Sequence, residues 1–375
     1  MSNQILLRAD THCHPHAGSS KRAIDCLQAL QWSYQTALDR GCKWVVDLGD
    51  VFHERHHIDT WTYVEVYKMA KAFKERGVNT LFVLGNHDMY FRDSTGHNAI
   101  MAFESMFRVV VDPTVVDLCG RPFDCFPYVE KNPQRVLEQV FPDKRSDVLF
   151  FHAAFDGAVM SSASGMRRKK GSGTNAHDMH EDEVAESIDP NGLTGWKFAW
   201  GGHYHLPQVF SETPCHAEYV GSLLQHNRGE TGERKRVVLM DVDTLATQDI
   251  YNTESPVFLK IDGDAPLDIP SDVNVAKARI YVYTADLGSA QVSETCRTLR
   301  KMGALQVLIE PKDVAIIDRE VQTQGIRGAA SMITDGDSMI RRFVKMQAPA
   351  DLETSRLVGV GQKIMRCADT GVFEE

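Results

Sequence analysis

Five short apolar runs constrain this chain more than any other feature, because metal-binding side chains follow each of them at once. The runs span residues 5–9, 44–48, 81–84, 148–151 and 196–200. Runs this short and rich in Val, Leu and Phe are typical of buried strands. They lead into D-T-H, G-D, G-N-H-D, H and G-G-H-Y-H, respectively. Ligands bind beyond the carboxyl ends of strands in open α/β sheets, so these endings predict one site of Asp, Asn and His.

Helical patterns separate the first three of these runs. Apolar residues recur at helical spacing over residues 23–40 and again over 61–76, where Gly77 marks a helix end. Alternation of strand and helix is typical of βαβ units and predicts a mostly parallel sheet. Closely spaced short runs then suggest an antiparallel finish, at residues 208–210, 217–220 and 235–242. The sequence predicts an α/β fold, a four-layer α/β/β/α sandwich, over residues 1–250.

A second part of the chain begins after a predicted boundary at residues 252–256. Strand-like runs at 257–261, 278–284 and 305–309, with a helix-like run at 290–302, indicate a small α+β domain over residues 256–325. Apolar residues at helical spacing then predict a helical C-terminal segment over residues 330–375.

Charge and composition limit the classes of protein that fit. The net charge of −10 is mild evidence against DNA binding without a partner, although DNA binding needs only a local basic surface. The eight cysteines include no CxxC pair, which favours reduced thiols in the cytoplasm. No apolar run approaches the roughly 18 to 20 residues of a membrane span. A strand begins almost at once, so no signal peptide is visible. We expect a cytoplasmic protein with no membrane contact.

The order of the ligand motifs, D-x-H, GD, GNHD, H and GHxH, resembles the signature of the calcineurin-like metallophosphoesterases. Within that superfamily the chain is most similar to the SbcD-like nuclease subunit of the double-strand-break repair complex. Residues 49–53 resemble its GD-x-F-H/D segment, and residues 221–224 resemble its late Gly-Ser turn. A small α/β segment and a helical tail also follow the catalytic domain in that family.

The resemblance implies a set of metal ligands. Asp10, His12 and His205 would hold one metal, and Asn86, His152 and His203 would hold the other. Asp50 would bridge both metals, because a carboxylate has two oxygens to share. Imidazole and carboxylate ligands without thiolate accommodate Mn, Fe, Zn or Ni, and the resemblance implies two Mn²⁺ ions. Two metals about 3.5 to 4 Å apart suit phosphodiester hydrolysis.

The resemblance also implies catalytic residues that do not bind metal. His87 would face the substrate and stabilise the phosphate or protonate the leaving oxygen, a role that suits its ordinary pKa. Asp88 would accept the other imidazole N–H of His87 and fix its orientation. His53 would position the substrate for exonuclease cleavage, although a plain polar loop over residues 53–57 is the alternative.

The implied function is a Mn²⁺-dependent DNA nuclease in double-strand-break repair or recombination. It would act as a 3′→5′ exonuclease on duplex ends and an endonuclease on single strands or hairpins. Residues 256–325 would contact DNA, and residues 330–375 would bind an SbcC-like SMC-type ATPase or simply pack on the core. The resemblance implies a homodimer, for which residues 99–107 are a candidate face, with core packing equally plausible.

Three other functions fit parts of the pattern. A dimetal phosphodiesterase acting on small nucleotides, or a phosphatase, would share the ligands but would need no residues beyond 256. A TatD-like barrel shares an opening HxH pair but lacks GD and GNHD. A non-enzymatic platform would have lost a ligand, and none is missing.

Several other features have no assigned role. The basic, glycine-rich residues 161–173 predict a surface loop, which could also touch phosphates. His14 and His16 fit no family role, and Cys13 is expected to be a buried thiol.

Overall fold

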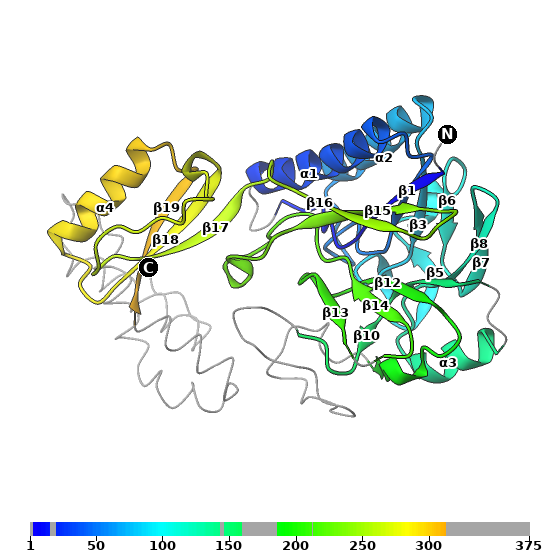
Figure 1. Ribbon diagram of the computed structural model, residues 1–375. Coiled ribbons are helices and arrows are strands. Elements are labelled where there is room, and N and C mark those ends of the chain that lie inside the picture. The colour runs from blue at the N-terminus through cyan, green and yellow to red at the C-terminus, as the bar shows by residue number, and fades with distance from the viewer. Residues whose placement is uncertain (1–2, 16–19, 143–145, 160–185, 212, 313–375) are drawn as a thin grey trace, which may run out of the picture. The chain divides into compact units, whose positions relative to one another are not determined.

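The computed structural model describes residues 3–15, 20–142, 146–159, 186–211 and 213–312 (Figure 1). Its helices are α1 (Ser20–Asp39), α2 (Thr60–Glu75), α3 (Pro133–Val140) and α4 (Ala290–Lys301), with short 3-10 turns η1 (Met101–Phe103), η3 (Pro190–Gly192), η4 (Arg228–Glu230) and η5 (Val275–Lys277). The strands are β1 (Gln4–Arg8), β2 (Trp44–Asp47), β3 (Asn79–Val83), β4 (Met89–Phe91), β5 (Ser94–Asn98), β6 (Arg108–Val110), β7 (Thr114–Leu118), β8 (Arg121–Phe126), β9 (Val148–His152), β10 (Ala154–Phe155), β11 (Ser187–Ile188), β12 (Phe198–Gly202), β13 (Gln208–Phe210), β14 (His216–Tyr219), β15 (Arg236–Asp241), β16 (Thr247–Tyr251), β17 (Val257–Asp262), β18 (Ala278–Thr284) and β19 (Gln306–Pro311).

Two six-stranded sheets form the frame of the larger part of the chain. The first has the order β16-β15-β1-β2-β3-β6, and β1, β2, β3 and β6 run parallel. The second has the order β13-β14-β12-β9-β8-β7, and β14, β12, β9 and β8 run parallel. The predicted antiparallel finish is present and is divided between the sheets, with β15 and β16 in the first and β13 in the second.

Alternating side chains create three buried layers between and around these sheets. Ile5 and Leu7 of β1 pack with Phe150 and Trp200 of the second sheet in a core between the two sheets. Leu6 points to the opposite face, where it joins a core with α1 and α2. The outer face of the second sheet packs on α3. The predicted four-layer α/β/β/α sandwich is therefore confirmed.

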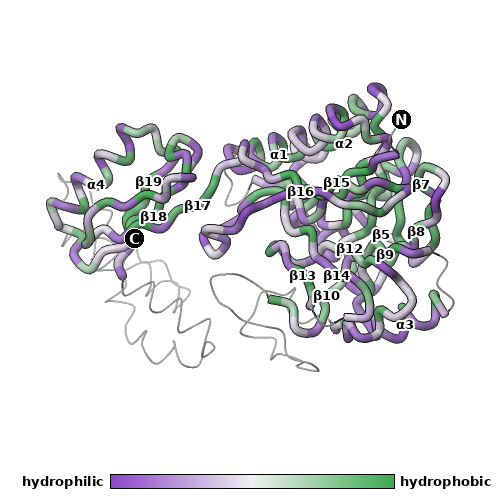
Figure 2. The backbone as a smooth tube through the Cα atoms, viewed as in Figure 1, coloured by the Kyte–Doolittle hydropathy of each residue, from purple (hydrophilic) through white to green (hydrophobic). Residues whose placement is uncertain are grey.

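The amphipathic helices explain how the outer layers form. Along α1 and α2 the colour alternates between hydrophobic and hydrophilic (Figure 2). Leu27, Leu30 and Tyr34 of α1 are buried, as are Val66 and Phe73 of α2. This is the helical spacing read from the sequence, and it covers one face of the first sheet.

A second, smaller unit contains residues 261–270, 281–301 and the described residues from 307. The strands β17, β18 and β19 form a three-stranded sheet in that order, and α4 lies between β18 and β19 in sequence. The strands and the helix lie close to the residue ranges predicted for them, and the domain bounds 256–325 stay a prediction. The helical segment predicted for residues 330–375 lies outside the described residues, as do residues 313–325.

Residues 99–107 are partly buried. Ile100, Phe103 and Phe107 are buried beneath α2 and belong to the core, whereas Met101 is exposed. In the part of the chain that the structure describes, no helix is long and apolar enough to cross a membrane.

Candidate metal centre

The seven predicted metal ligands meet at one edge of the two sheets. They lie at the carboxyl ends of β1, β2 and β3 in the first sheet and of β9 and β12 in the second: Asp10, His12, Asp50, Asn86, His152, His203 and His205. Carboxyl ends of parallel strands are the usual place for ligand sites in such sheets.

The first cluster comprises Asp10, His12 and His205. One ligand atom from each residue lies within 4.8 Å of the others. Nε2 of His12 faces Nε2 of His205 at 3.0 Å. Each neutral imidazole has one nitrogen with a lone pair, so two facing nitrogens suit a shared cation.

The second cluster comprises Asp50, His152 and His203, again within 4.8 Å, together with Asn86. Oδ1 of Asn86 lies 2.9 Å from Nε2 of His152 and 3.0 Å from Nδ1 of His203. Two imidazoles and one amide oxygen therefore converge at this point.

Asp50 faces both clusters. Its Oδ2 lies 3.3 Å from Nε2 of His152 and 3.7 Å from Nε2 of His12. Its Oδ1 accepts a hydrogen bond from the backbone N–H of His87 at 2.8 Å. This position between the clusters fits the bridging role expected of Asp50.

His53 and His87 form a stacked pair beside the first cluster. Their rings are nearly parallel, at 8°, with centroids 5.3 Å apart. One ring nitrogen of each lies within 4.8 Å of a ring nitrogen of His12. Both are half-buried, so they border the site from its solvent side. His53 therefore lies beside the first cluster, where a role in positioning substrate stays a prediction.

Asp88 has a different position from the expected one. We expected it to orient the ring of His87, but the carbonyl oxygen of His53 lies 2.5 Å from Nδ1 of that ring. The two carboxylate oxygens of Asp88 instead accept backbone N–H groups of Asp50, Phe52 and Gly85 at 3.0 to 3.2 Å. Its carboxylate therefore ties the G-D loop to the G-N-H-D loop, because buried N–H groups need acceptors.

The loops at the site hold unusual backbone conformations. Asp10, His12, Asp50 and His203 all have positive φ angles, of 50°, 45°, 55° and 110°. Such conformations cost about 1 to 3 kcal/mol each and cluster at functional sites. Backbone hydrogen bonds hold two of them, from the N–H of His12 to Asp50 at 2.9 Å and from that of Asp10 to Gly49 at 3.0 Å.

Glycine is required where these loops touch. A Cβ on Gly49, at φ +99°, would lie 2.3 Å from Nδ1 of His152. A Cβ on Gly85 would lie 2.2 Å from the backbone nitrogen of Asp50. The glycines before ligand residues thus permit the close approach that the sequence predicted.

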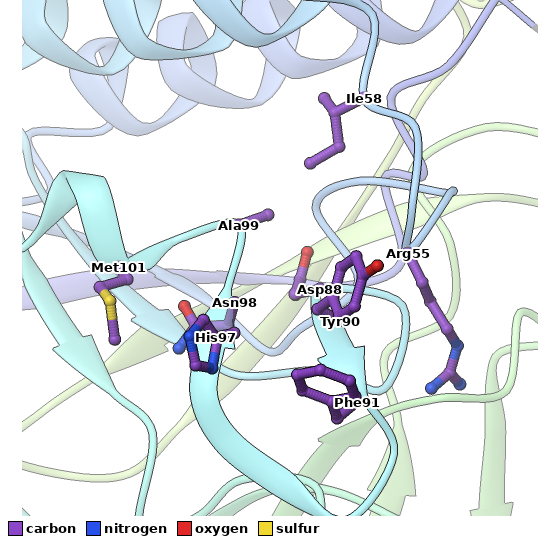
Figure 3. A pocket seen from close by; sticks show the side chains of 9 residues that line it. All are labelled: Arg55, Ile58, Asp88, Tyr90, Phe91, His97, Asn98, Ala99 and Met101. Atoms are coloured by element: carbon purple, nitrogen blue, oxygen red, sulfur yellow. The ribbon is translucent and has the colours of Figure 1, made fainter.

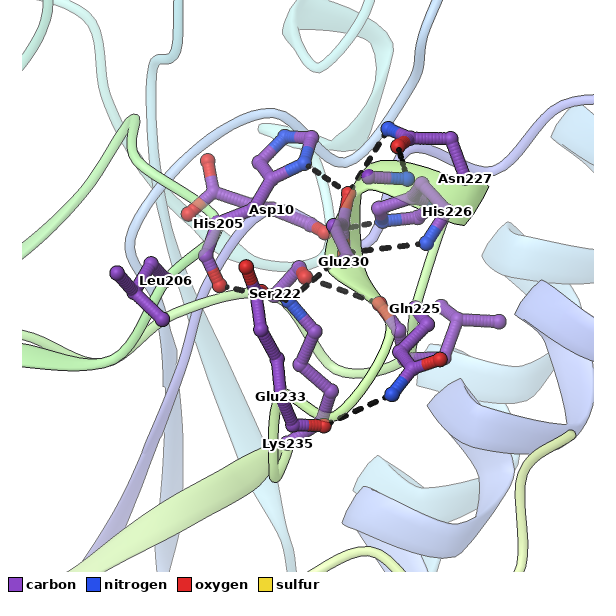
Figure 4. Close-up of polar contacts among 12 residues, drawn as sticks. Asp10, His205, Leu206, Ser222, Gln225, His226, Asn227, Glu230, Glu233 and Lys235 are labelled. Atoms are coloured by element: carbon purple, nitrogen blue, oxygen red, sulfur yellow. Dashed lines mark hydrogen bonds and ion pairs between the residues drawn. The ribbon is translucent and has the colours of Figure 1, made fainter. Parts of the chain in front are cut away.

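A buried charged network supports the first cluster (Figure 4). Oε1 of Glu230 lies 3.0 Å from Nδ1 of His205, and Oε2 lies 2.7 Å from Nζ of Lys235. Glu233 also contacts this Nζ at 2.7 Å, and Nε2 of His226 contacts the backbone oxygen of Asp10 at 3.0 Å. Sequence reasoning missed these residues, because R-G-E-T-G-E-R-K between apolar runs has the composition of a solvated turn.

Burial and close packing shift the pKa values within the site. Burial raises the pKa of Asp10 to about 6, although His152 and His205 lower it. For Asp50, burial is outweighed by His152 and His87, which hold its pKa well below the usual range. Burial lowers the pKa of His152, but Asp50 outweighs it and raises that pKa to about 9. Burial disfavours the charged form of each of these side chains, and a neighbouring side chain of opposite charge favours it.

The donor set fits divalent metal ions. Imidazole, carboxylate and amide donors converge in both clusters, and the other nitrogen of His152 and His205 already has an acceptor. Nδ1 of His152 lies 2.7 Å from the carbonyl oxygen of Leu48, and Nδ1 of His205 lies near Glu230. Such acceptors fix the tautomer of a ligating histidine and leave Nε2 for a metal. When bound, the metals would supply the positive charge that polarises a phosphate ester.

The remaining residues singled out in the sequence lie around or outside this centre. His14 is half-buried, with Nε2 3.4 Å from Oε1 of exposed Glu54 and its ring centroid 5.3 Å from that of His53. Cys13 is buried, and burial raises the pKa of its thiol well above the usual range. His16 and residues 161–173 lie outside the described residues.

Comparison with known proteins agrees with this geometry. The family model for calcineurin-like phosphoesterases matches residues 4–207. The DNA double-strand break repair protein Mre11 of Aeropyrum pernix is 25% identical over 296 residues, covering 76% of this chain and 64% of that protein. The chain thus matches less than two thirds of that relative's length.

The chain also has a weak likeness to the solved structure of an archaeal phosphodiesterase, with a TM-score of 0.34 and 12% identity. The match covers 66% of this chain and 99% of that one. Because the family model covers more than half of the 375 residues, the chain belongs to the calcineurin-like phosphoesterase family, whose members are metal-dependent hydrolases.

Proposed function

We propose that this protein is a two-metal DNA nuclease that hydrolyses phosphodiester bonds in double-strand-break repair or recombination. The observation that supports this best is the pair His53 and His87, stacked beside the first of two ligand clusters that Asp50 faces. Similarity to a DNA double-strand break repair protein at 25% identity supports DNA as the substrate. The proposed activities are 3′→5′ exonuclease on duplex ends and endonuclease on single strands, in the cytoplasm.

Each site residue has a proposed role. Asp10, His12 and His205 hold one metal, and Asn86, His152 and His203 hold the other, with Asp50 between them. His87 borders the clusters and can stabilise the phosphate or donate a proton to the leaving oxygen. His53 positions the substrate and, through its carbonyl oxygen, the ring of His87. Asp88 acts indirectly, by joining the two loops that carry Asp50 and His87.

The proposed metals are two Mn²⁺ ions. Mixed imidazole and oxygen ligands without thiolate suit Mn²⁺ among several divalent metals. Cys13 and Cys26, the cysteines near the site, are buried thiols whose pKa values are raised by burial.

The proposed partners are DNA ends, a second copy of the chain and an SbcC-like SMC-type ATPase. In this proposal residues 1–250 form the catalytic domain, residues 256–325 contact DNA, and residues 330–375 bind the ATPase. The described part of residues 256–325 contains the strands β17, β18 and β19 and the helix α4. Residues 99–107 stay the candidate face of the proposed homodimer, since Met101 is exposed there, whereas Ile100, Phe103 and Phe107 are buried.

Digestion of 5′-end-labelled duplex DNA with Mn²⁺, Mg²⁺ or EDTA tests the proposal. We expect stepwise shortening with Mn²⁺, and a loss of about 10²- to 10⁴-fold in His87→Ala, the range for a general acid. Metal content of that variant should stay at two ions per chain, because His87 is not a proposed ligand. Hydrolysis of a small phosphodiester but not of DNA would instead indicate a nucleotide phosphodiesterase.

A further inference from the structure

A pocket of about 470 Å³ is lined by residues that follow His53 and His87 in the sequence (Figure 3). Its walls include Arg55, Ile58, Asp88, Tyr90, Phe91 and His97. This volume lies within the range of about 300 to 1,000 Å³ that is common for small-molecule sites. None of the roles assigned above uses the pocket, apart from Asp88, whose carboxylate holds the loops of the site.

The two loops that carry His53 and His87 continue directly into the pocket walls. Arg55 lies two residues after His53, and Tyr90 lies three residues after His87. The rings of His56 and Tyr90 connect the two walls, with centroids 4.7 Å apart. A substrate bound at the clusters would therefore have its neighbouring groups next to this pocket.

Aromatic side chains on the pocket wall are unusually exposed. Tyr90 is 47% exposed and Phe91 is 50% exposed, on one strand of the β4–β5 hairpin. Their rings meet edge to face with centroids 4.7 Å apart, and Phe91 meets His97 of β5 in the same way at 5.8 Å. Edge-to-face contacts fix the rings but leave aromatic faces open to a ligand.

The hairpin that carries these rings is anchored to the site. The N–H of Ala99 donates to the backbone oxygen of Asp88 at 2.8 Å, and Met89 pairs with Asn98. Asp88 in turn holds the backbone of the G-D loop. The aromatic wall is therefore fixed relative to the clusters, as a specificity subsite needs to be.

We propose that this pocket receives one unstacked base of the DNA strand that is cleaved at the clusters. The inference rests on the proposed nuclease function and adds a subsite to it. Every nucleobase has a flat π-face, which stacks on exposed aromatic rings without sequence preference. The Arg55 guanidinium on the wall can stack on a base as well, and Ile58 supplies an apolar contact. A base is flat and apolar-faced, as this wall requires, whereas a sugar or phosphate is not.

Cleavage of single strands that carry one abasic residue tests the subsite. The wild-type protein should cleave beside a normal base about 5- to 150-fold faster than beside the abasic position, the range that stacking of one base contributes. Phe91→Ala and Tyr90→Ala should lose this preference. They should cleave normal DNA more slowly than the wild type and cleave beside the abasic position at the wild-type rate. Phe91→Leu, which keeps an apolar side chain but no aromatic face, should behave like Phe91→Ala, and Phe91→Trp should retain the preference.

Tyr251→Ala provides the matched control, because Tyr251 is also an exposed aromatic, at 38%, but lies on β16 away from the pocket. Quenching of a 2-aminopurine nucleotide, which reports stacking without cleavage, gives an independent measurement. If the wild type cleaves the normal and the abasic strand at equal rates, and no quenching is seen, the subsite is overturned and the nuclease function stays intact. Absence of any DNA cleavage overturns the nuclease function, and quenching then decides the subsite alone. A shift from dimer to monomer in Phe91→Ala, with the base preference unchanged, would assign the pocket to a second copy.

Discussion

The two metal clusters support their histidines in different ways. In the first cluster, Nδ1 of His205 faces the carboxylate of Glu230, which is paired with Lys235. In the second cluster, Nδ1 of His152 faces only the backbone oxygen of Leu48. A carboxylate brings a full charge that raises the basicity of the ring, whereas a carbonyl brings a dipole. Substitution of a side chain can therefore change the basicity of His205 in the first cluster. In the second cluster the partner of His152 is set by the position of the backbone.

Asp50→Asn should have the largest effect, because Asp50 is the residue placed between the clusters. Loss of one carboxylate charge should weaken metal binding in both, and activity should fall by more than the 10- to 100-fold typical of a supporting residue. Metal content after gel filtration, measured by mass spectrometry, and nuclease rates would check this. Retention of one metal at wild-type affinity would show instead that the clusters are independent.

Gly49→Ala should damage the second cluster selectively. The new Cβ would lie 2.3 Å from Nδ1 of His152, where the ring meets the backbone oxygen of Leu48. Gly77→Ala is the matched control, since φ is +92° there and no atom lies within 4 Å of the added Cβ. Backbone strain should lower the unfolding free energy of both variants by about 1 to 3 kcal/mol, and the clash should add a further loss in Gly49→Ala alone.

Only Gly49→Ala should also lose the metal of the second cluster. Urea denaturation and metal titration of the two variants separate these contributions. If both variants bind two metals equally, close packing against His152 does not position the second cluster.

The fold was largely predictable because local patterns decided it. Apolar runs predicted β1, β2, β3, β9 and β12, and helical spacing predicted α1 and α2 to within a few residues. The β4–β5 hairpin had no such pattern, since S-T-G-H-N is polar and its pairing depends on contacts with the site. Division of the late strands between two sheets is likewise a long-range choice that no local period encodes.

The ligands were predictable and their supports were not, for a related reason. Asp10 and His203 each lie next to a strand end and belong to a sequence motif. Their residue type and their position therefore both indicate that they are ligands. Glu230 and Lys235 lie in a charged turn, and only folding brings them to His205, 25 and 30 residues away in sequence. The predicted contact of Asp88 with the ring of His87 was wrong. Backbone N–H groups, which have no sequence signature, bind the carboxylate oxygens of Asp88 instead.

Glu230→Gln should have the smallest of these effects and the most selective one. The amide keeps an oxygen near Nδ1 of His205 but removes the charge, so metal affinity of the first cluster should fall about 10- to 100-fold. Glu233→Gln is the matched control, because Glu233 is buried and lies 2.7 Å from the same Lys235 nitrogen. Both variants remove one buried carboxylate charge beside Lys235 and should therefore lose stability. Mn²⁺ titration followed by electron paramagnetic resonance should show one weakened site in Glu230→Gln and two unchanged sites in Glu233→Gln. Equal weakening in both variants would mean that the network stabilises the fold and does not tune the first cluster.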